Sequence, residues 1–211
     1  MRLRVLHALR LAGLADTAAV AARAGLAEAV ALQVLEAAAS RDEVRRREGR
    51  LAGWILTSAG RAAAEAMLAA ELDRTGARPR VERAYGRFLE LNPELLAACT
   101  AWQVRDPARG ALNDHTDARY DSAVVDRLAA VHDWVRPICV DLAAALDRFA
   151  GYESRMARAL ARVRAGETEW FARPLVDSYH TVWFELHEDL LATLGVARES
   201  ESETGSGPIR S

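Results

Sequence analysis

The chain lacks lysine altogether and has few cysteines. All 28 of its lysine or arginine positions are arginines. Its cations are therefore planar guanidiniums, which bind phosphate or carboxylate through paired hydrogen bonds. The 2 cysteines, Cys99 and Cys139, lie far apart inside helical patterns. This excludes a disulfide framework or a thiolate zinc site, and we interpret both as small core side chains.

Long apolar runs and catalytic motifs are missing as well. No stretch approaches the ~20 consecutive apolar residues of a membrane span, and the N-terminus enters an amphipathic pattern without a signal-peptide cleavage site. We therefore expect a cytoplasmic protein with no membrane contact. Phosphate-binding loops, a serine nucleophile elbow, a Cys-His pair and closely spaced metal ligands are also absent from the sequence. We expect no enzyme activity, no cofactor and no bound metal.

What is present is a chain of 211 residues rich in alanine and leucine. Its composition, 51% hydrophobic and 27% charged, is typical of a globular protein, and its alanine and leucine favour helix. The length allows two domains. We place the boundary near Gly76, between a domain at residues 1–76 and a helical effector or dimerisation domain at 77–198, with a disordered tail at 199–211.

The charge is distributed unevenly around a net value of −2. Residues 1–80 carry thirteen arginines against nine acidic residues, whereas the remainder carries fifteen against twenty-one. A basic N-terminal part on an acidic body suits a polyanionic partner for the first domain. Ordinary variation of surface charge is the alternative interpretation.

The first forty residues predict three short helices. Apolar residues near helical spacing predict the first from Leu3 to Leu14. Asp16-Thr17 supplies an N-cap for a second helix that closes at Gly25, and a third helix runs from about Ala27 to Ala39. Small alanines let the second and third helices cross closely, and glycine allows a left-handed turn between them. This layout is typical of a helix-turn-helix.

A basic hairpin is expected next. The arginine-rich segment 44–47, a turn around Gly49 and the β-forming segment 53–57 predict two short strands, and Thr57-Ser58 caps a long helix from about Ala59. The order of elements, closing in Gly-Trp-Ile-Leu-Thr-Ser-Ala-Gly-Arg, resembles winged-helix regulators of the MarR type, whose wing strand commonly runs into the pattern LT-x-x-G-R. The resemblance covers residues 3–72, about a third of the chain.

This resemblance implies a mainly α fold, with an N-terminal winged helix-turn-helix that has a two-stranded β-hairpin wing and a C-terminal all-α domain. It also implies a double-stranded DNA partner, with the third helix in the major groove and the wing at the backbone or minor groove. The DNA-binding residues expected on this basis are Arg23, Glu28, Gln33, Arg41, Arg45, Arg46, Arg47 and Arg50.

The third helix is poorly equipped to read bases. Its expected outer face is rich in alanine, and only Gln33 offers a bidentate contact to adenine. Glu28 and Glu36 could accept a hydrogen bond from cytosine, but phosphates repel them. We therefore expect binding to depend on wing arginines and backbone contacts. The alternative is a solvated hairpin edge whose charge resists aggregation.

Beyond Pro79 the pattern is helical. We expect helices at about 80–91, from Asn92-Pro93 to 104, at 117–149 with a break or kink near Pro137, at 152–165 and at about 174–194, with a polar loop at 105–116. On the last helix two histidines share a largely apolar face, and the opposite side, with Asp177 and Glu185, is expected to be a solvated acidic surface.

Histidines and aromatic residues gather in this second half. The residues expected to line an effector pocket are His132, Trp134, Tyr179, His180, Trp183 and His187. A metal site completed by Asp114 or Asp117 and simple packing of half-buried histidines are the alternatives.

Two functions stay open from the sequence. One is a transcriptional regulator that binds DNA as a homodimer, under control of a small-molecule effector or a partner protein. The other is a degenerate winged helix used as a protein-interaction module, which the alanine-rich outer face of the third helix motivates.

Overall fold

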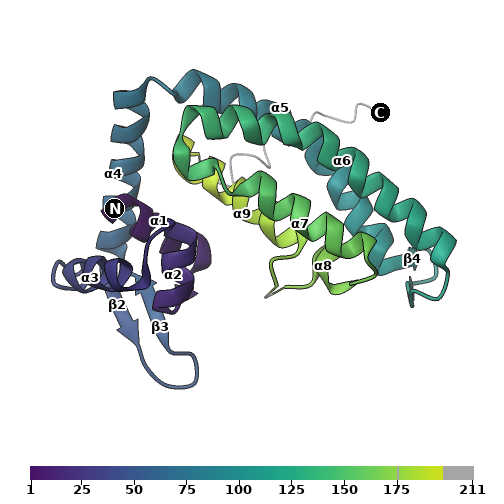
Figure 1. The fold of residues 1–211 in the computed structure, drawn as a ribbon, viewed down its shortest axis with the longest axis horizontal. Coiled ribbons are helices and arrows are strands. Elements are labelled where there is room, and N and C mark those ends of the chain that lie inside the picture. The colour runs from purple at the N-terminus through teal and green to yellow at the C-terminus, as the bar shows by residue number, and fades with distance from the viewer. Residues whose placement is uncertain (175, 197–211) are drawn as a thin grey trace, which may run out of the picture. The chain divides into compact units, whose positions relative to one another are not determined.

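The chain is mainly helical, and the computed structural model describes residues 1–174 and 176–196. Its described residues divide into two compact units (Figure 1), one formed by residues 1–78 with 188–196, and one by Pro79–His187. The division after residue 78 lies two residues beyond the boundary expected from the sequence. The last turns of the final helix belong to the first unit rather than to the second. The tail expected at 199–211 lies outside the described residues.

The first unit contains four helices and three short strands ahead of the linker to the second. In chain order they are α1 (Arg2–Ala12), β1 (Leu14–Ala15), α2 (Thr17–Ala24), α3 (Glu28–Ala39), β2 (Val44–Arg47), β3 (Gly53–Leu56) and α4 (Ser58–Thr75). The side chain of Asp16 caps α2 by accepting the Ala19 N–H at 2.8 Å. Gly25 follows α2 with left-handed backbone, φ 63°. The predicted cap and turn are confirmed.

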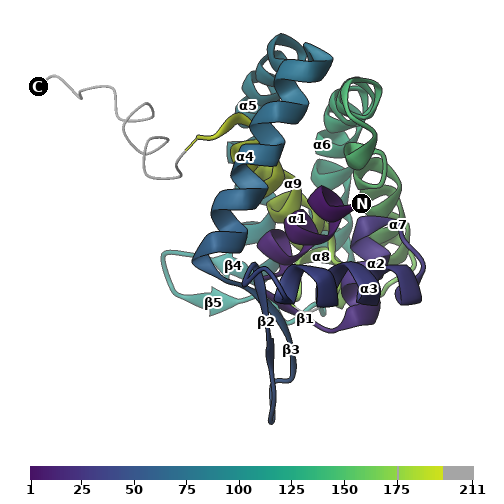
Figure 2. The same cartoon turned by 90° about the vertical axis from the view of Figure 1, so that its left-hand side faces the viewer.

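The hairpin of the first unit belongs to a sheet of three strands, not two. The strand order is β1-β3-β2, and the added strand pairs Leu14 with Ile55 and Ala15 with Trp54, antiparallel to β3. A strand of two residues is too short to show the alternating pattern by which strands are recognised, which explains why the sequence did not reveal it. Figure 2 shows β2 and β3 extending beyond α2 and α3 of the same unit.

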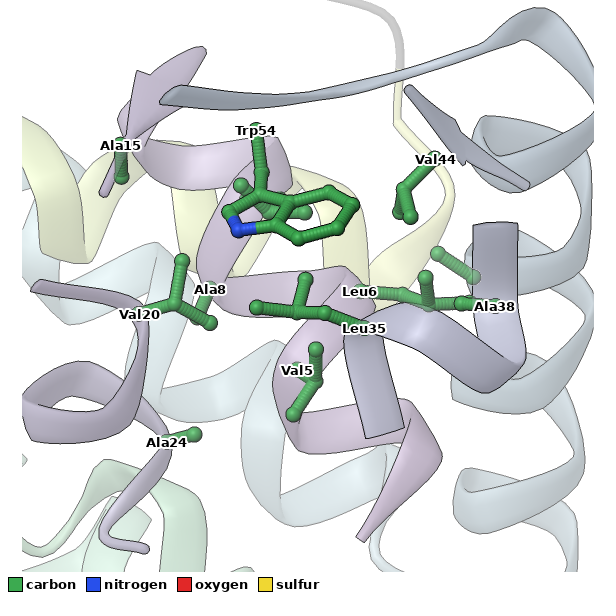
Figure 3. Close-up of a cluster of buried hydrophobic side chains, with 12 residues drawn as sticks. Val5, Leu6, Ala8, Ala15, Val20, Ala24, Leu35, Ala38, Val44 and Trp54 are labelled. Carbon is green, nitrogen blue, oxygen red and sulfur yellow. The ribbon is translucent and has the colours of Figure 1, made fainter. Parts of the chain in front are cut away.

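The core of the first unit gathers side chains from all of its helices. Figure 3 shows the indole of Trp54 lying over Leu35 and near Val44. The indole Nε1 donates a hydrogen bond to Thr17 Oγ1 at 3.1 Å, so the one polar atom of this ring is satisfied at the start of α2. Trp54 therefore ties the base of the hairpin to the helices.

No single helix of the described residues is long and apolar enough to cross a membrane. The helices α2 and α3 reach the length and apolar composition of a membrane span only when they are taken together, and a bend of 105° separates them.

The second unit is built from long helices. Its elements are α5 (Arg78–Gln103), β4 (Val104–Asp106), β5 (Ala111–Leu112), α6 (Ala118–Ala145), a short 3-10 helix η1 (Asp147–Phe149), α7 (Tyr152–Arg164), α8 (Glu169–Ala172) and α9 (Tyr179–Leu194). The expected helix start at Asn92-Pro93 is wrong, because α5 continues through Pro93, and α6 likewise continues through Pro137. Both prolines are exposed, so the carbonyl that each deprives of a donor can face water.

Two further expectations about the second unit need correction. It is not all-α, because β4 and β5 form an antiparallel hairpin within the polar loop. The Asp106 carboxylate accepts the N–H groups of Ala108 and Arg109, which folds the turn. The last helix begins at Tyr179 rather than near Pro174, since Ser178 Oγ accepts the Thr181 N–H at 3.3 Å as an N-cap does.

Candidate nucleic-acid interface

Four arginines lie on the hairpin formed by β2 and β3. The strand β2 buries Val44 and leaves Arg45, Arg46 and Arg47 exposed. Because successive side chains of a strand point to opposite faces, Arg45 and Arg47 share the face opposite Val44. Arg50 lies in the turn between the strands and is also exposed. The hairpin thus presents cations on its outer face and at its tip.

These four arginines, which we call the hairpin arginines, are not neutralised by the protein's own carboxylates. None of them forms an ion pair with an acidic side chain in the part of the chain that the structure describes. The guanidinium carbon of Arg46 lies 5.9 Å from the centroid of the Trp54 ring, a cation–π contact that leaves its N–H donors available. Only Glu48 opposes them within the hairpin. The result is a solvated cluster of phosphate-binding groups.

The hairpin leaves the helices at a junction built around Glu43, which is 5% exposed. Its carboxylate accepts hydrogen bonds from Arg2, with Nε at 3.0 Å, and from Arg41, with Nε at 3.3 Å. Burial raises the pKa of Glu43, but these two guanidiniums hold it below its ordinary value. The Thr57 N–H donates to the Glu43 carbonyl at 3.1 Å. The junction therefore fixes where β2 starts and where β3 ends.

Gly60 completes this junction from the first turn of α4. Its N–H donates to Thr57 Oγ1 at 3.0 Å, which caps the helix as predicted. A Cβ atom at position 60 would lie 1.8 Å from the Glu43 carbonyl oxygen, so only glycine allows the helix to approach the hairpin this closely.

The helix α3 turns toward solvent the face that the sequence predicts. Ala31, Leu35 and Ala38 are buried, and the outer residues Glu28, Gln33 and Glu36 are exposed. Among the outer residues, Leu32 is 36% exposed. This face therefore presents one amide, two carboxylates and small apolar groups, and it holds no cation.

The two remaining predicted arginines differ from the hairpin arginines. Arg23 is exposed in the last turn of α2. Arg41 follows α3, and its guanidinium is engaged by Glu43 of the junction. We therefore assign Arg41 to holding the hairpin base.

A small pocket opens beside the hairpin. It has a volume of about 110 Å³ and is lined by Asp16, Thr17, Arg46, Ala52, Gly53 and Trp54. Pockets for drug-sized ligands are usually ~300–1,000 Å³. This one is too small for such an effector, although a few water molecules would fit.

The residues expected to form an effector pocket in the second unit lie mostly in its core. The Tyr179 hydroxyl lies 3.4 Å from His132 Nδ1. The ring of Trp183 stacks on Phe88 with centroids 4.4 Å apart, and the His187 ring lies 5.5 Å from the Phe88 ring. These side chains pack on one another as a layer of rings.

Trp134 does not share this environment, which corrects its assignment to the pocket. It is 69% exposed. Trp134 follows His132 by two residues, and residues two apart on a helix lie on nearly opposite faces. His180 is half-buried. Burial lowers the pKa values of both His132 and His180, so both imidazoles favour the neutral form.

Neither a metal centre nor a reactive thiol stands out in the described ranges. No group of three or more His, Cys, Asp or Glu side chains among residues 1–174 and 176–196 could hold a metal ion. Cys99 and Cys139 are buried, and burial raises the pKa of each thiol to about 12, which suppresses the thiolate.

Sequence reasoning missed Glu43 and Gly60 as the residues that position the hairpin. The signal available was a single acidic side chain directly before an arginine-rich strand, and a glycine within the first turn of a predicted helix.

Comparison of the chain with family models, with curated proteins and with solved structures finds no match.

Proposed function

We propose that this chain is a winged helix-turn-helix transcriptional regulator that binds double-stranded DNA as a homodimer. The observation that carries the proposal is the exposure of the four hairpin arginines without carboxylate partners in the described chain. Such guanidiniums on a projecting hairpin are suited to DNA phosphates or to insertion in the minor groove.

The arrangement of α2 and α3 supports this proposal. Helices of a helix-turn-helix cross at about 90–120°, and the bend between α2 and α3 is 105° with a left-handed glycine at the turn. The second helix of the motif enters the major groove in such regulators. In this chain that helix is α3, and Gln33 on its outer face is suited to adenine.

The hairpin contributes most of the affinity in this proposal. The exposed carboxylates of Glu28 and Glu36 on α3 are repelled by phosphates, so base contacts from that helix are few. Affinity then comes from phosphate contacts, and sequence preference comes from DNA shape together with Gln33. Ligand or partner binding to the helical second unit would alter the affinity by shifting a population of conformations.

Binding to a fluorescent duplex of about 30 base pairs, taken from upstream of the coding sequence, tests the proposal through fluorescence anisotropy. The test variant replaces the hairpin arginines Arg45, Arg46, Arg47 and Arg50 with glutamine. The matched control replaces four exposed arginines of the second unit, namely Arg83, Arg119, Arg136 and Arg164. We expect the test variant to lose affinity on the order of a hundredfold at low salt. The control should bind like the wild type.

Equal binding by both variants, or no binding by the wild type at low salt, would contradict the proposal. The second candidate, a degenerate winged helix that binds a protein, would then be favoured by the small apolar groups and Leu32 on the outer face of α3. Its signature is co-purification of a stoichiometric partner protein that a Leu32→Glu variant no longer retains.

A further inference from the structure

The helix α6 exposes a large aromatic side chain. Trp134 is 69% exposed. A tryptophan normally buries most of its surface, and an exposed large aromatic side chain is often part of an interaction surface. The residues around Trp134 show what kind of surface it is.

Trp134 lies within a regular row of exposed residues on α6. Each member is separated from the next by four or three residues in alternation, which is the spacing of contact positions in paired helices. We call this row the α6 seam. Its members are Ala123, Arg127, Ala130, Trp134, Pro137, Asp141 and Ala144, and all of them are exposed. Small residues on both sides of the indole would let a second helix approach closely.

The α6 seam is complementary to itself. If a second copy of α6 is laid antiparallel, with the two Trp134 side chains adjacent, Arg127 of one copy lies beside Asp141 of the other, because each is seven residues from Trp134. The same operation sets Ala130 opposite position 138, next to Pro137, and Ala123 opposite position 145, next to Ala144. Isologous contacts of this kind, made twice about a two-fold axis, are what closed dimers use.

The charges of the seam fit this arrangement. Arg127 forms no ion pair within the described residues of its own chain. Asp141 accepts a hydrogen bond from Arg87 Nη1 at 2.8 Å, and both side chains are about half exposed, at 52% and 46%. A carboxylate has two oxygens with room for several donors, so Asp141 can accept Arg127 of a second copy as well.

We infer that the α6 seam is the surface through which two copies of this chain associate, antiparallel and with Trp134 at the two-fold axis. The inference rests on the proposed function for the role of the dimer in regulation, but the contact involves none of the hairpin arginines. Self-association is therefore measured without DNA. One like-charged pair opposes the contact, because Asp133 beside Trp134 would lie near its own copy.

Sedimentation equilibrium of the full chain tests the inference. We expect a dimer for the wild type and an increase of about thirtyfold in the dissociation constant for Trp134→Ala, the size of a central interface contact. Leu112→Ala is the matched control, since Leu112 is 75% exposed on β5 and lies outside the seam. Its dissociation constant should stay that of the wild type. An Asp133→Asn variant should associate slightly more tightly.

A mixing experiment identifies the register. Arg127→Asp sets two carboxylates together at both ends of the contact, and Asp141→Arg sets two guanidiniums together, so each variant alone should be weakened at least tenfold. Mixed in equal amounts, the two variants should form a heterodimer, because each end again pairs opposite charges. A wild type that stays monomeric, or variants that do not recover on mixing, would overturn the inference. DNA binding that persists in such a monomer and is lost with the hairpin arginines would leave DNA binding through the hairpin standing, while removing the homodimer from the proposed function.

Discussion

The hairpin arginines of the first unit and Arg155 of the second unit lie in opposite environments. In the first unit the hairpin arginines are exposed and without carboxylate partners among the described residues. In the second unit Arg155, with a side chain 20% exposed, donates to Asp177 Oδ1 at 2.7 Å and to Glu185 Oε2 at 2.9 Å. Richness in arginine therefore does not identify a polyanion-binding surface by itself. What distinguishes the hairpin arginines is that four exposed guanidiniums without carboxylate partners in the described chain lie close together in one hairpin.

The two units also differ in how closely backbone segments approach one another within each unit. In the first, α4 packs against the Glu43 carbonyl so closely that position 60 has no room for a Cβ atom. In the second, Gly86 lies within α5 with nothing within 4 Å of the position a Cβ would take. The first unit, built from short helices and strands, needs close contact between backbone segments. The second unit, built from long helices, is held by side-chain packing.

The largest effect should come from breaking the junction at the base of the hairpin. Gly60→Ala forces a Cβ atom into the Glu43 carbonyl, and we expect a decrease of more than about 3 kcal/mol in the unfolding free energy of the first unit. Hydrogen exchange should show weaker protection in α1, α2 and α3. Gly86→Ala is the matched control in open space, where alanine should stabilise α5 by about 0.5–1 kcal/mol. Equal effects at the two positions would contradict the close approach.

A smaller decrease is expected from the buried ion cluster of the second unit. Burial lowers the pKa of Arg155, but hydrogen bonds to Glu185 and Asp177 hold it above its ordinary value. Arg155→Ala removes both Arg155 hydrogen bonds from Glu185, which is 8% exposed, and also those to Asp177. We expect a decrease of about 2–3 kcal/mol in unfolding free energy by urea denaturation. Arg47→Ala on the hairpin should change it by less than about 0.5 kcal/mol. Similar decreases would erase the contrast between buried and exposed arginines.

Acid should lower the unfolding free energy of the second unit by less than the loss of Arg155 does. Burial holds the pKa of His132 below its ordinary 6.5, so the unfolded chain binds the proton more readily than the folded one. The stabilisation is fully present above pH 6.5 and is lost as the pH falls from there toward the lowered folded pKa, by about 1.4 kcal/mol for each pKa unit of lowering. In His132→Gln the pH dependence of unfolding should be shallower between pH 7 and 5. Superimposable profiles for wild type and variant would contradict this.

His180 supplies a control on the pH experiment. Burial lowers its pKa as well, so His132→Gln should retain part of the slope and a His132→Gln/His180→Gln double variant should retain less. A full slope in the double variant would assign the acid sensitivity to other groups.

Local signals explain why the first unit was the more predictable one. The cap at Asp16, the turn at Gly25 and the cap at Thr57 each act within three or four residues, so the sequence shows them directly. The exposure of Arg45 and Arg47 also follows from alternation along a short strand, whereas Arg46 is exposed although it lies on the face of buried Val44. The Glu43 junction depends instead on Arg2, 41 residues away in the sequence, and no local pattern records that interaction.

The second unit was less predictable because its decisive interactions are distant. The acidic side expected on the last helix is not solvated at Glu185, since Arg155 lies 30 residues earlier and pairs with it. The sequence predicts a helix start at Pro93 and a break or kink at Pro137, but α5 and α6 continue through them because tertiary packing of long helices outweighs the absence of one hydrogen bond. Helical spacing alone also could not separate buried His132 from exposed Trp134 until the packed face of α6 was known.

The salt dependence of DNA binding measures directly whether the hairpin arginines contact phosphates. The logarithm of the association constant is measured against the logarithm of salt concentration for the wild type and for the variant with all four hairpin arginines replaced by glutamine. If the hairpin arginines bind phosphates, the variant's slope should be shallower by about 0.9 for each phosphate that is no longer neutralised. Parallel lines for the two proteins would show that the hairpin does not touch the DNA backbone and would contradict phosphate binding by the hairpin arginines.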